Sequence, residues 1–144
     1  MLNQSQRAYL AGFLDGDGSI YVQAKLNSTY KFGFQIAPYI VFFQSNQSKR
    51  NFVKVCSLIN LGYLRERNDG ILEYIIGKSN NIRKFIKDVK KFLILKQEQA
   101  DLIISILDDK EKIKNKNQFN GLLKKIDRFR ELNYSKKRKQ RLTP

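Results

Sequence analysis

Hydrophobic and polar residues repeat along the first part of this chain with periods that predict one helix and two strands. Apolar residues at helical spacing indicate a helix over 5–15, which the following Asp-Gly-Asp-Gly-Ser sequence is expected to end. Strict alternation over 20–27 predicts a half-buried strand, and a second strand follows over 32–42. Pro38 lies inside the second strand, so we expect this strand to lie at a sheet edge or to contain a bulge.

The rest of the chain repeats the pattern of helix, strand, strand and helix, and then adds two helices. The Asn68-Asp69-Gly70 turn is typical of a hairpin between two short strands. The charged segment 108–117 is expected to be a loop. In chain order, the expected elements are a helix at 49–60, strands at 63–67 and 71–76, and helices at 82–89, 95–107 and 119–132.

This order predicts an α+β fold of the form αββαββα with two further C-terminal helices. The 144 residues suffice for one domain with a proper core, and the basic segment 133–144 is expected to be a tail. The strands have polar residues on one side only, which predicts an antiparallel sheet with helices behind one face and an open opposite face. The expected open face contains Gln23, Lys25, Asn27, Lys31, Gln35, Tyr39, Arg65, Arg67 and Glu73.

Charge changes the interpretation of that open face. The chain has 28 Lys and Arg against 13 Asp and Glu, a formal net charge of +15, which favours binding to a polyanion. Lys, Arg, Gln and Asn side chains on a ribbon can read base edges in the major groove, so nucleic-acid contact is expected here. The alternatives are a solvated sheet face or a basic ribosomal component. Ala37, Val41 and Ile75 fall on the same face and could contact thymine methyl groups.

Several features that the sequence lacks narrow the possible chemistry and location of the protein. The chain has no His, which excludes mechanisms that use His as a base or metal ligand, and its single Cys56 excludes a disulfide framework. It has no long apolar run and no signal-peptide pattern, so neither a membrane span nor secretion is expected.

Frequent Lys, Ile and Asn residues indicate AT-rich codons, which points to an organelle genome, chloroplast or mitochondrial.

Two acids, Asp15 and Asp17, lie at the C-terminal end of the first helix, where the helix dipole disfavours negative charge. Their carboxylates and the last helix carbonyls would form a nest of hard oxygens that suits Mg²⁺ or Ca²⁺. An EF-hand is excluded, because Ile20 and Leu26 would occupy its glycine and glutamate positions. A turn without a metal remains the alternative.

Small residues recur on the same helix. Gly12 and Gly16 are four apart and adjoin Ala8 and Ala11, a spacing that lets two helices approach closely. The partner could be the chain's own core or the same helix of a second subunit. A subunit interface would bring two acid nests side by side.

The segment Tyr9-Leu-Ala-Gly-Phe-Leu-Asp-Gly-Asp-Gly18, extended by Ser19 and Ile20, resembles the motif of the LAGLIDADG homing endonucleases. A single copy in a chain of this length is similar to the homodimeric branch of that family. The similarity continues in order through Gln23-x-Lys25-x-Asn27, Tyr30-Lys-Phe32, Gly62-Tyr-x-Arg-x-Arg67, Phe92-Leu-x-Leu-Lys-Gln-x-Gln-Ala100 and Leu132-Asn-x-Ser-Lys136.

The resemblance implies site roles residue by residue. Asp17 matches the metal-binding acid and Gly16 supplies a carbonyl ligand, while Gln44 orders solvent near the scissile phosphate and Lys96 stabilises charge there. A basic family residue aligns with Ser48, which leaves Lys49 or Arg50 as a substitute catalytic group. Contacts to DNA are expected from Gln23, Lys25, Asn27, Thr29, Tyr30, Gln35, Ala37, Tyr39, Val41, Arg65, Arg67, Glu73, Ile75, Ser135, Lys136 and Lys137. The dimer interface is expected to contain Ala8, Leu10, Ala11, Gly12, Asp15 and Gly16.

The implied function is a site-specific, intron-encoded double-strand DNA endonuclease that acts as a homodimer on a long pseudo-palindromic target. Mg²⁺ is the implied cofactor, with Mn²⁺ able to substitute and Ca²⁺ able to bind without supporting cleavage. The implied partners are double-stranded DNA and a second copy, with no membrane and no small-molecule substrate. Two alternatives stay open: an RNA maturase that assists intron splicing, and a DNA-binding protein that kept the fold but lost cleavage.

Overall fold

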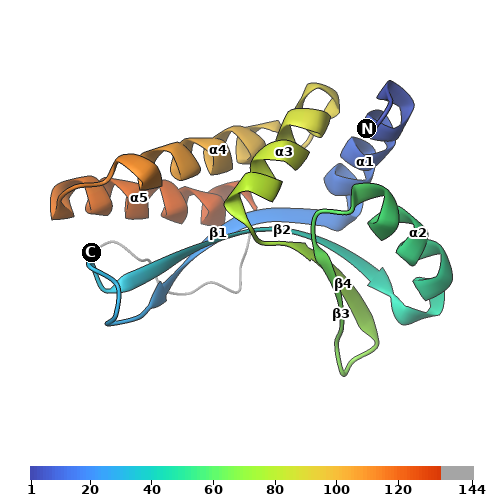
Figure 1. The fold of residues 1–144 in the computed structure, drawn as a ribbon, viewed down its shortest axis with the longest axis horizontal. Coiled ribbons are helices and arrows are strands. Elements are labelled where there is room, and N and C mark those ends of the chain that lie inside the picture. Colours follow the sequence, from blue (N-terminus) through green and yellow to red (C-terminus); the bar gives the residue numbers. More distant parts are fainter. Residues whose placement is uncertain (134–144) are drawn as a thin grey trace.

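A computed structural model describes residues 1–133, and over these residues the order of elements agrees with the sequence pattern (Figure 1). Two short 3₁₀ helices, η1 (Asn46–Ser48) and η2 (Lys90–Phe92), are added to the expected elements. The main elements are α1 (Gln4–Asp17), β1 (Gly18–Leu26), β2 (Phe34–Ser45), α2 (Lys49–Ile59), β3 (Tyr63–Glu66), β4 (Ile71–Ile76), α3 (Ser79–Val89), α4 (Gln97–Lys112) and α5 (Lys116–Leu132).

The four strands form one antiparallel sheet in the order β1-β2-β4-β3. β1 pairs with β2 along its whole length, from Gly18 opposite Phe42 to Leu26 opposite Phe34, without a bulge. β4 pairs only with the second half of β2, from Ile40 onward. Pro38 therefore lies where β2 has a single neighbour, so the edge alternative is correct for this half of a strand that is central elsewhere.

The helices cover one face of the sheet and enclose the core (Figure 1). Alternate residues of β1 and β2 point to this side, and Ile20, Val22, Ile36, Ile40 and Phe42 among them are almost completely buried. The rings of Phe42 and Phe85 meet edge to face at 5.7 Å, which joins the sheet to α3. At the far end of the hairpin between β1 and β2, Phe32 stacks on Phe119 of α5 at 5.0 Å.

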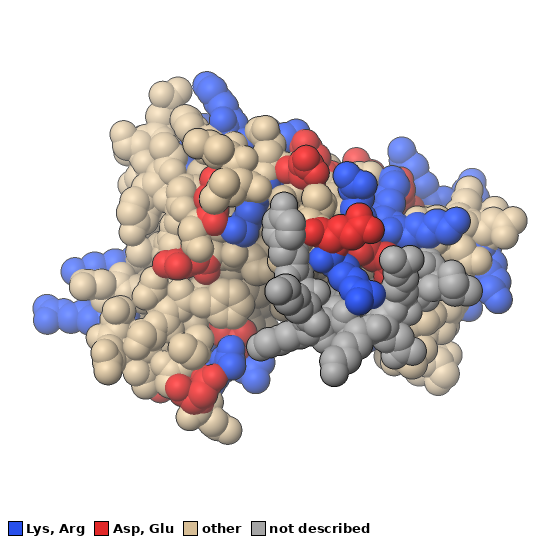
Figure 2. Space-filling model, turned by 180° about the vertical axis from the view of Figure 1, so that it is seen from behind, with Lys and Arg blue, Asp and Glu red and all other residues tan. Residues whose placement is uncertain are grey.

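Four helices, α1, α3, α4 and α5, are longer than the sequence pattern indicated. α1 begins with a capping box in which Asn3 and Gln6 exchange hydrogen bonds, and it continues through Asp17 rather than ending at residue 15. α4 continues to Lys112, through the first part of the charged segment 108–117 that was expected to be a loop. Arg83 of α3 binds Asp108 at 2.7 Å and Glu111 at 3.3 Å, so these acids have partners within the helical layer. Acidic and basic side chains lie interspersed over this layer (Figure 2).

The opposite face of the sheet is not covered by any of the described helices, and the sheet curves so that both hairpins point away from the helical layer (Figure 1). Glycines permit the two tight hairpin turns, since Gly33 and Gly70 have φ of 80° and 84°. The predicted basic tail lies outside the described residues, apart from Asn133. None of the helices within residues 1–133 is long and apolar enough to span a bilayer.

Candidate active site

The C-terminal end of α1 passes directly into β1, and this junction determines where Asp17 points. Asp17 is the last helical residue, and the strand begins at Gly18 without an intervening loop. A Cβ atom at Gly18 would lie 2.5 Å from the Leu14 side chain and 2.9 Å from the Leu14 carbonyl oxygen. Only glycine permits this close approach. The Asp17 carboxylate is consequently held at the surface.

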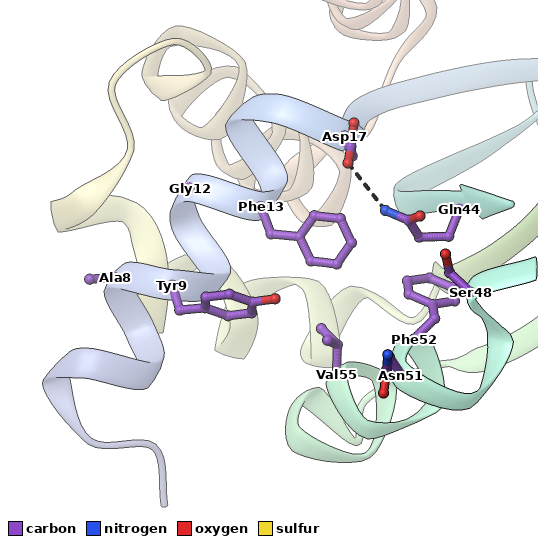
Figure 3. Close-up of a pocket in the computed structure, with 10 residues that line it drawn as sticks. All are labelled: Ala8, Tyr9, Gly12, Phe13, Asp17, Gln44, Ser48, Asn51, Phe52 and Val55. Carbon is purple, nitrogen blue, oxygen red and sulfur yellow. Dashed lines mark hydrogen bonds between the residues drawn. The ribbon is translucent and has the colours of Figure 1, made fainter.

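Asp17 and Gln44 meet, as the family resemblance implied. Gln44 lies next to the last residue of β2, and its Nε2 donates a hydrogen bond to Asp17 Oδ2 at 3.2 Å (Figure 3). The two residues are 27 positions apart in the sequence. The pairing of β1 with β2 brings them together, because Gly18 lies opposite Phe42.

A groove of about 570 Å³ adjoins this pair, between α1 and α2. In Figure 3, Tyr9 and Phe13 of α1 face Phe52 and Val55 of α2 across it. The groove thus combines an apolar wall with a polar end at Asp17.

The basic substitute considered for the Ser48 position does not line this groove. Ser48 and Asn51 line it, and neither is charged. Lys49 instead binds Glu66 of β3 at 3.1 Å, and Arg50 is exposed outside the groove lining. The sequence did not single out Asn51, and no signal in its neighbourhood pointed to it.

Asp15 does not belong to an oxygen nest with Asp17, which corrects the expectation. Residues two apart on a helix are about 200° apart around its axis, so the two carboxylates point to different sides. Asp15 Oδ2 accepts a hydrogen bond from the Ile94 amide at 2.8 Å, and Oδ1 accepts one from the Lys96 amide at 3.0 Å. Lys96 Nζ donates to the Asp15 carbonyl oxygen at 2.6 Å. Lys96 is therefore at the end of α1.

The donor set around Asp17 fits a divalent cation only in part. The last turn of a helix presents carbonyl oxygens without intrahelical partners, which include that of Gly16, and the exposed Asp17 carboxylate adds hard oxygens. Among residues 1–133, however, no group of three or more His, Cys, Asp or Glu side chains could hold a metal ion. One chain thus contributes a partial site, which a second carboxylate and phosphate oxygens would have to complete.

The proposed interface residues on α1 divide into two groups. Ala8, Gly12 and Gly16 form an exposed strip, and a Cβ atom at either glycine would meet nothing within 4 Å. Packing within the chain therefore does not explain these glycines. Leu10 and Ala11 are fully buried in the chain's own core, so their assignment to the interface is wrong. Asp15 is also engaged within the chain.

The uncovered face of the sheet presents the polar side chains expected from the alternation. Cross-strand pairs place Lys25 opposite Gln35 and Tyr21 opposite Tyr39. Lys25 Nζ donates to the Tyr39 hydroxyl at 2.8 Å. The Tyr21 and Tyr39 rings are 5.2 Å apart, and burial, together with Tyr39, raises the pKa of the Tyr21 hydroxyl. Tyr21 was not among the candidates, although the alternation of the strand places it on the same side as Gln23 and Lys25.

The neighbouring strands continue this surface. Arg65 lies opposite Glu73 with 4.0 Å between their charged groups, and Gln23 lies opposite Ala37. Arg67 binds Asp69 within the hairpin turn. The other candidates on this side, all in the turn after β1, are Asn27, Thr29, Tyr30 and Lys31.

Three apolar candidates lie on the predicted face but are largely buried. Ala37, Val41 and Ile75 are 8%, 1% and 6% exposed. A thymine methyl could touch Val41 or Ile75 only if neighbouring side chains moved. The candidates Ser135, Lys136 and Lys137 lie outside the described residues.

The curved antiparallel sheet is joined to a helix that is lined with glycines and ends in an exposed acid. This combination is characteristic of one class of protein. The sequence profile described as LAGLIDADG endonuclease matches residues 10–104, and the chain belongs to this family. The chain is 35% identical over 138 residues to DNA endonuclease I-CreI of Chlamydomonas reinhardtii, a match that covers 95% of this chain and 84% of that protein. It is 29% identical over 105 residues to DNA endonuclease I-CvuI of Chlorella vulgaris, covering 73% of this chain and 65% of that protein.

Solved structures agree with this assignment. The homing endonuclease I-CvuI in complex with the I-CreI target, in the presence of 2 mM Mg, has a TM-score of 0.87 with 27% identity, covering 94% of this chain and 86% of that one. Its complex with its own target, in the presence of 2 mM Ca, gives 0.88 with 26% identity, covering 95% and 87%. The predicted fold class is thereby confirmed.

Proposed function

We propose that this chain is a divalent-metal-dependent endonuclease that hydrolyses phosphodiester bonds in both strands of a specific DNA target. The observation that carries the proposal is the contact between Asp17 and Gln44 at the end of α1, beside the uncovered polar face of the sheet. The relatives I-CreI and I-CvuI are DNA endonucleases, and I-CvuI binds DNA in its solved structures. Family membership and site geometry therefore support the same reaction.

DNA would lie along the curved face of the sheet. β1 has 9 residues, which at roughly 3.3 Å per residue span about 30 Å, or nearly 10 base pairs. Lys25, Tyr39 and Arg65 present donors and acceptors that suit base edges and phosphates. A chain with a net charge of +15 gains further affinity from counterion release.

The active form would be a homodimer that packs through the exposed strip of α1. Gly12 and Gly16 leave open space where a second helix can approach. Tyr9, Ile94 and Leu95 are large exposed apolar residues, and burial against a second copy would remove this surface from water. The two-fold symmetry of a homodimer would bring two Asp17 carboxylates together and make a pseudo-palindromic target of roughly 20 base pairs.

Asp17 and the Gly16 carbonyl are the groups that would hold the cation, preferably Mg²⁺, with Mn²⁺ as a substitute and Ca²⁺ bound without cleavage. When bound, such an ion polarises phosphoryl oxygens and lowers the pKa of water. Gln44 orients the Asp17 carboxylate and orders solvent near the phosphate. Lys96 supplies a positive charge at the end of α1, where charge develops on the leaving oxygen.

The gene would reside in an organelle intron, in line with the frequent Lys, Ile and Asn residues and with relatives from Chlamydomonas and Chlorella.

A DNA-binding protein without cleavage is the second candidate, since Ser48 and Asn51 leave the groove beside Asp17 without a basic group. RNA maturation would require binding to an intron transcript rather than to duplex DNA.

The test starts from a randomised DNA duplex library. Duplexes bound in Ca²⁺ are selected, sequenced and then incubated with Mg²⁺ or with EDTA. We expect a long, nearly two-fold symmetric site that is cut on both strands only with Mg²⁺. Selection of a site without cleavage would favour the binding protein, and preference for intron RNA over duplex would favour the maturase.

A further inference from the structure

The Asp15 carboxylate fastens two distant parts of the chain together. It accepts hydrogen bonds from the amides of Ile94 and Lys96, which are 79 and 81 positions away. These amides belong to the short segment between η2 and α4, and Lys96 is the N-cap residue of α4. We call the Asp15 carboxylate with these two amides the Asp15 clamp.

The clamp explains why an acid is tolerated at the C-terminal end of α1. A carboxylate there is disfavoured by the dipole of its own helix. The same carboxylate lies at the N-terminal end of α4, where backbone amides have no intrahelical partner and the dipole favours negative charge. The favourable end of α4 thus offsets the unfavourable end of α1, and two charge-assisted hydrogen bonds add to this.

Asp15 holds Lys96 at two points, the backbone amide and the end of the side chain. Its amide binds the Asp15 carboxylate, and its Nζ binds the Asp15 main-chain carbonyl at 2.6 Å. Leu93, at the start of this segment, is buried in the core, but Ile94 and Leu95 are 84% and 71% exposed, so the core supports the segment at one end only. Without the clamp, the position of the Lys96 backbone would depend on Leu93 and on the start of α4.

We propose that Asp15 is a positioning residue for cleavage, which acts by holding Lys96 at the end of α1. This role rests on the proposed function, because it assigns Lys96 a part in cleavage. Asp15 touches neither substrate nor cation, and its whole effect on the rate passes through Lys96. The motif thus contains two acids with separate tasks, one at the phosphate and one at the lysine.

The first test is Asp15→Asn. An asparagine offers one acceptor oxygen, and its amide nitrogen would face the second backbone N–H, donor against donor. We expect hydrogen exchange of the Ile94 or Lys96 amide to accelerate, which measures the clamp without any cleavage. In single-turnover reactions at saturating protein, the rate should fall by about 10- to 100-fold, below the effect of losing a stabilising donor outright. Affinity for the target in Ca²⁺ should change by less than about threefold.

The control and a second variant separate positioning from stability. Asp88→Asn removes the ion pair with Arg7, which also ties α1 to its neighbours but does not involve Lys96. It should cleave at the wild-type rate even if it melts as early as Asp15→Asn. Ile94→Pro removes one clamp donor and leaves the acid in place, and the preceding Leu93 already has the extended ψ of 139° that a residue before proline adopts. It should slow cleavage in the same way, even if Asp15→Asn folds poorly, while sedimenting in the same oligomeric state as the wild-type protein, because Ile94 is also one of the exposed apolar residues assigned to the subunit interface.

A double-mutant cycle with Lys96→Ala decides the mechanism. If Asp15 acts through Lys96, then Asp15→Asn should slow Lys96→Ala by less than about threefold. An equal loss in both backgrounds, or an equal loss in Asp88→Asn, would overturn the positioning role. So would accelerated amide exchange with an unchanged cleavage rate. Failure of the wild-type protein to cleave any selected site would overturn the proposed function, and the role of Asp15 with it.

Discussion

The last turn of α1 contains two aspartates, one on each side of the helix, which differ in their hydrogen-bond partners. On one side, Asp15 binds two backbone amides and Lys96 closes over its carbonyl, so the polar groups satisfy one another. On the other side, Asp17 is exposed and has the Gln44 amide as its hydrogen-bond partner, next to an open groove. Between the two sides runs the strip of Ala8, Gly12 and Gly16.

The comparison shows how two carboxylates of one short motif can have different surroundings. Composition does not distinguish the two acids, and both break the same rule about negative charge at a helix C-terminus. What distinguishes them is the partner: α4 compensates Asp15, whereas the hydrogen bond to Asp17 seen within residues 1–133 comes from the neutral Gln44 amide. An uncompensated charge at the surface is where a cation is expected.

The largest effect is expected from Asp17→Asn, which removes the exposed carboxylate at the end of α1. The change keeps the size of the side chain but removes one negative charge per chain, so a cation should be lost or misplaced. Double-strand cleavage of the selected target in Mg²⁺ should fall by at least about 10³-fold. In EDTA, target affinity should stay the same or increase, because a carboxylate facing a phosphate repels it.

The matched control is Asp101→Asn, which removes an exposed acid that pairs with Lys90 in the helical layer. It should cleave at the wild-type rate. If Asp17→Asn also cleaves at that rate, Asp17 has no part in the mechanism. If it folds but no longer binds DNA, Asp17 is structural.

A second large effect is expected from Gly12→Leu, which tests the strip between the two sides. Among the residues that the structure describes, nothing lies within 4 Å of a Cβ atom at this position, so the leucine should be tolerated within one chain and even favoured by helix propensity. In a dimer it would push the two helices apart. Sedimentation should therefore show monomers or aggregates where the wild-type protein is a dimer.

Gly121→Leu is the control for that variant. Gly121 is another helical glycine with open space around its Cβ position, but it lies on α5. We expect this variant to remain a dimer. A wild-type protein that sediments as a monomer both free and on DNA would contradict the interface.

A smaller effect is expected from Gln44→Leu, which removes the side-chain amide that donates a hydrogen bond to Asp17. The leucine cannot orient the carboxylate or order solvent, so cleavage should slow by about tenfold, or roughly 1.4 kcal/mol. Gln47→Leu is the control, because Gln47 is exposed on the neighbouring turn and does not line the groove. Equal single-turnover rates for the two variants would remove Gln44 from the mechanism.

The smallest effect concerns Cys56, on the inner side of α2. Burial raises the pKa of its thiol from 9.0 to about 11, so the reactive thiolate should be roughly 100-fold scarcer than in a free cysteine at pH 8. Reaction with a disulfide reagent should be slow until denaturant is added. Fast labelling of the native protein would show that the side of α2 facing the core opens readily.

Periodicity was sufficient to predict the architecture, because each strand alternates and each helix has one apolar face. It failed where charge and periodicity conflict, as in 108–112, since the ion pairs of Asp108 and Glu111 with Arg83 come from another helix. The assignment of Leu10 and Ala11 to the interface failed, because small-residue spacing alone does not reveal which side of a helix the core covers.

The candidate site residues came from the motif, but their contacts could not be predicted from the sequence. The motif and its flanking matches led to Asp17, Gln44 and Lys96, and the structure brings all three to the end of α1. No local pattern could reveal that Asp15 binds amides some 80 positions away. Long-range hydrogen bonds of this kind depend on how the helices pack, which a single sequence does not display.

The pairing of β2 with β4 over only half its length has a consequence for how this protein can change over time. The first half of β2 and its partner β1 form a two-stranded arm beyond the rest of the sheet, and Phe32 and Phe34 fasten the arm to Phe119. Outward-facing residues of the arm, such as Gln23, Lys25 and Gln35, take no part in the core. Substitutions there are close to neutral for folding, so a lineage can explore new recognition sequences while the core and the cleavage site stay intact.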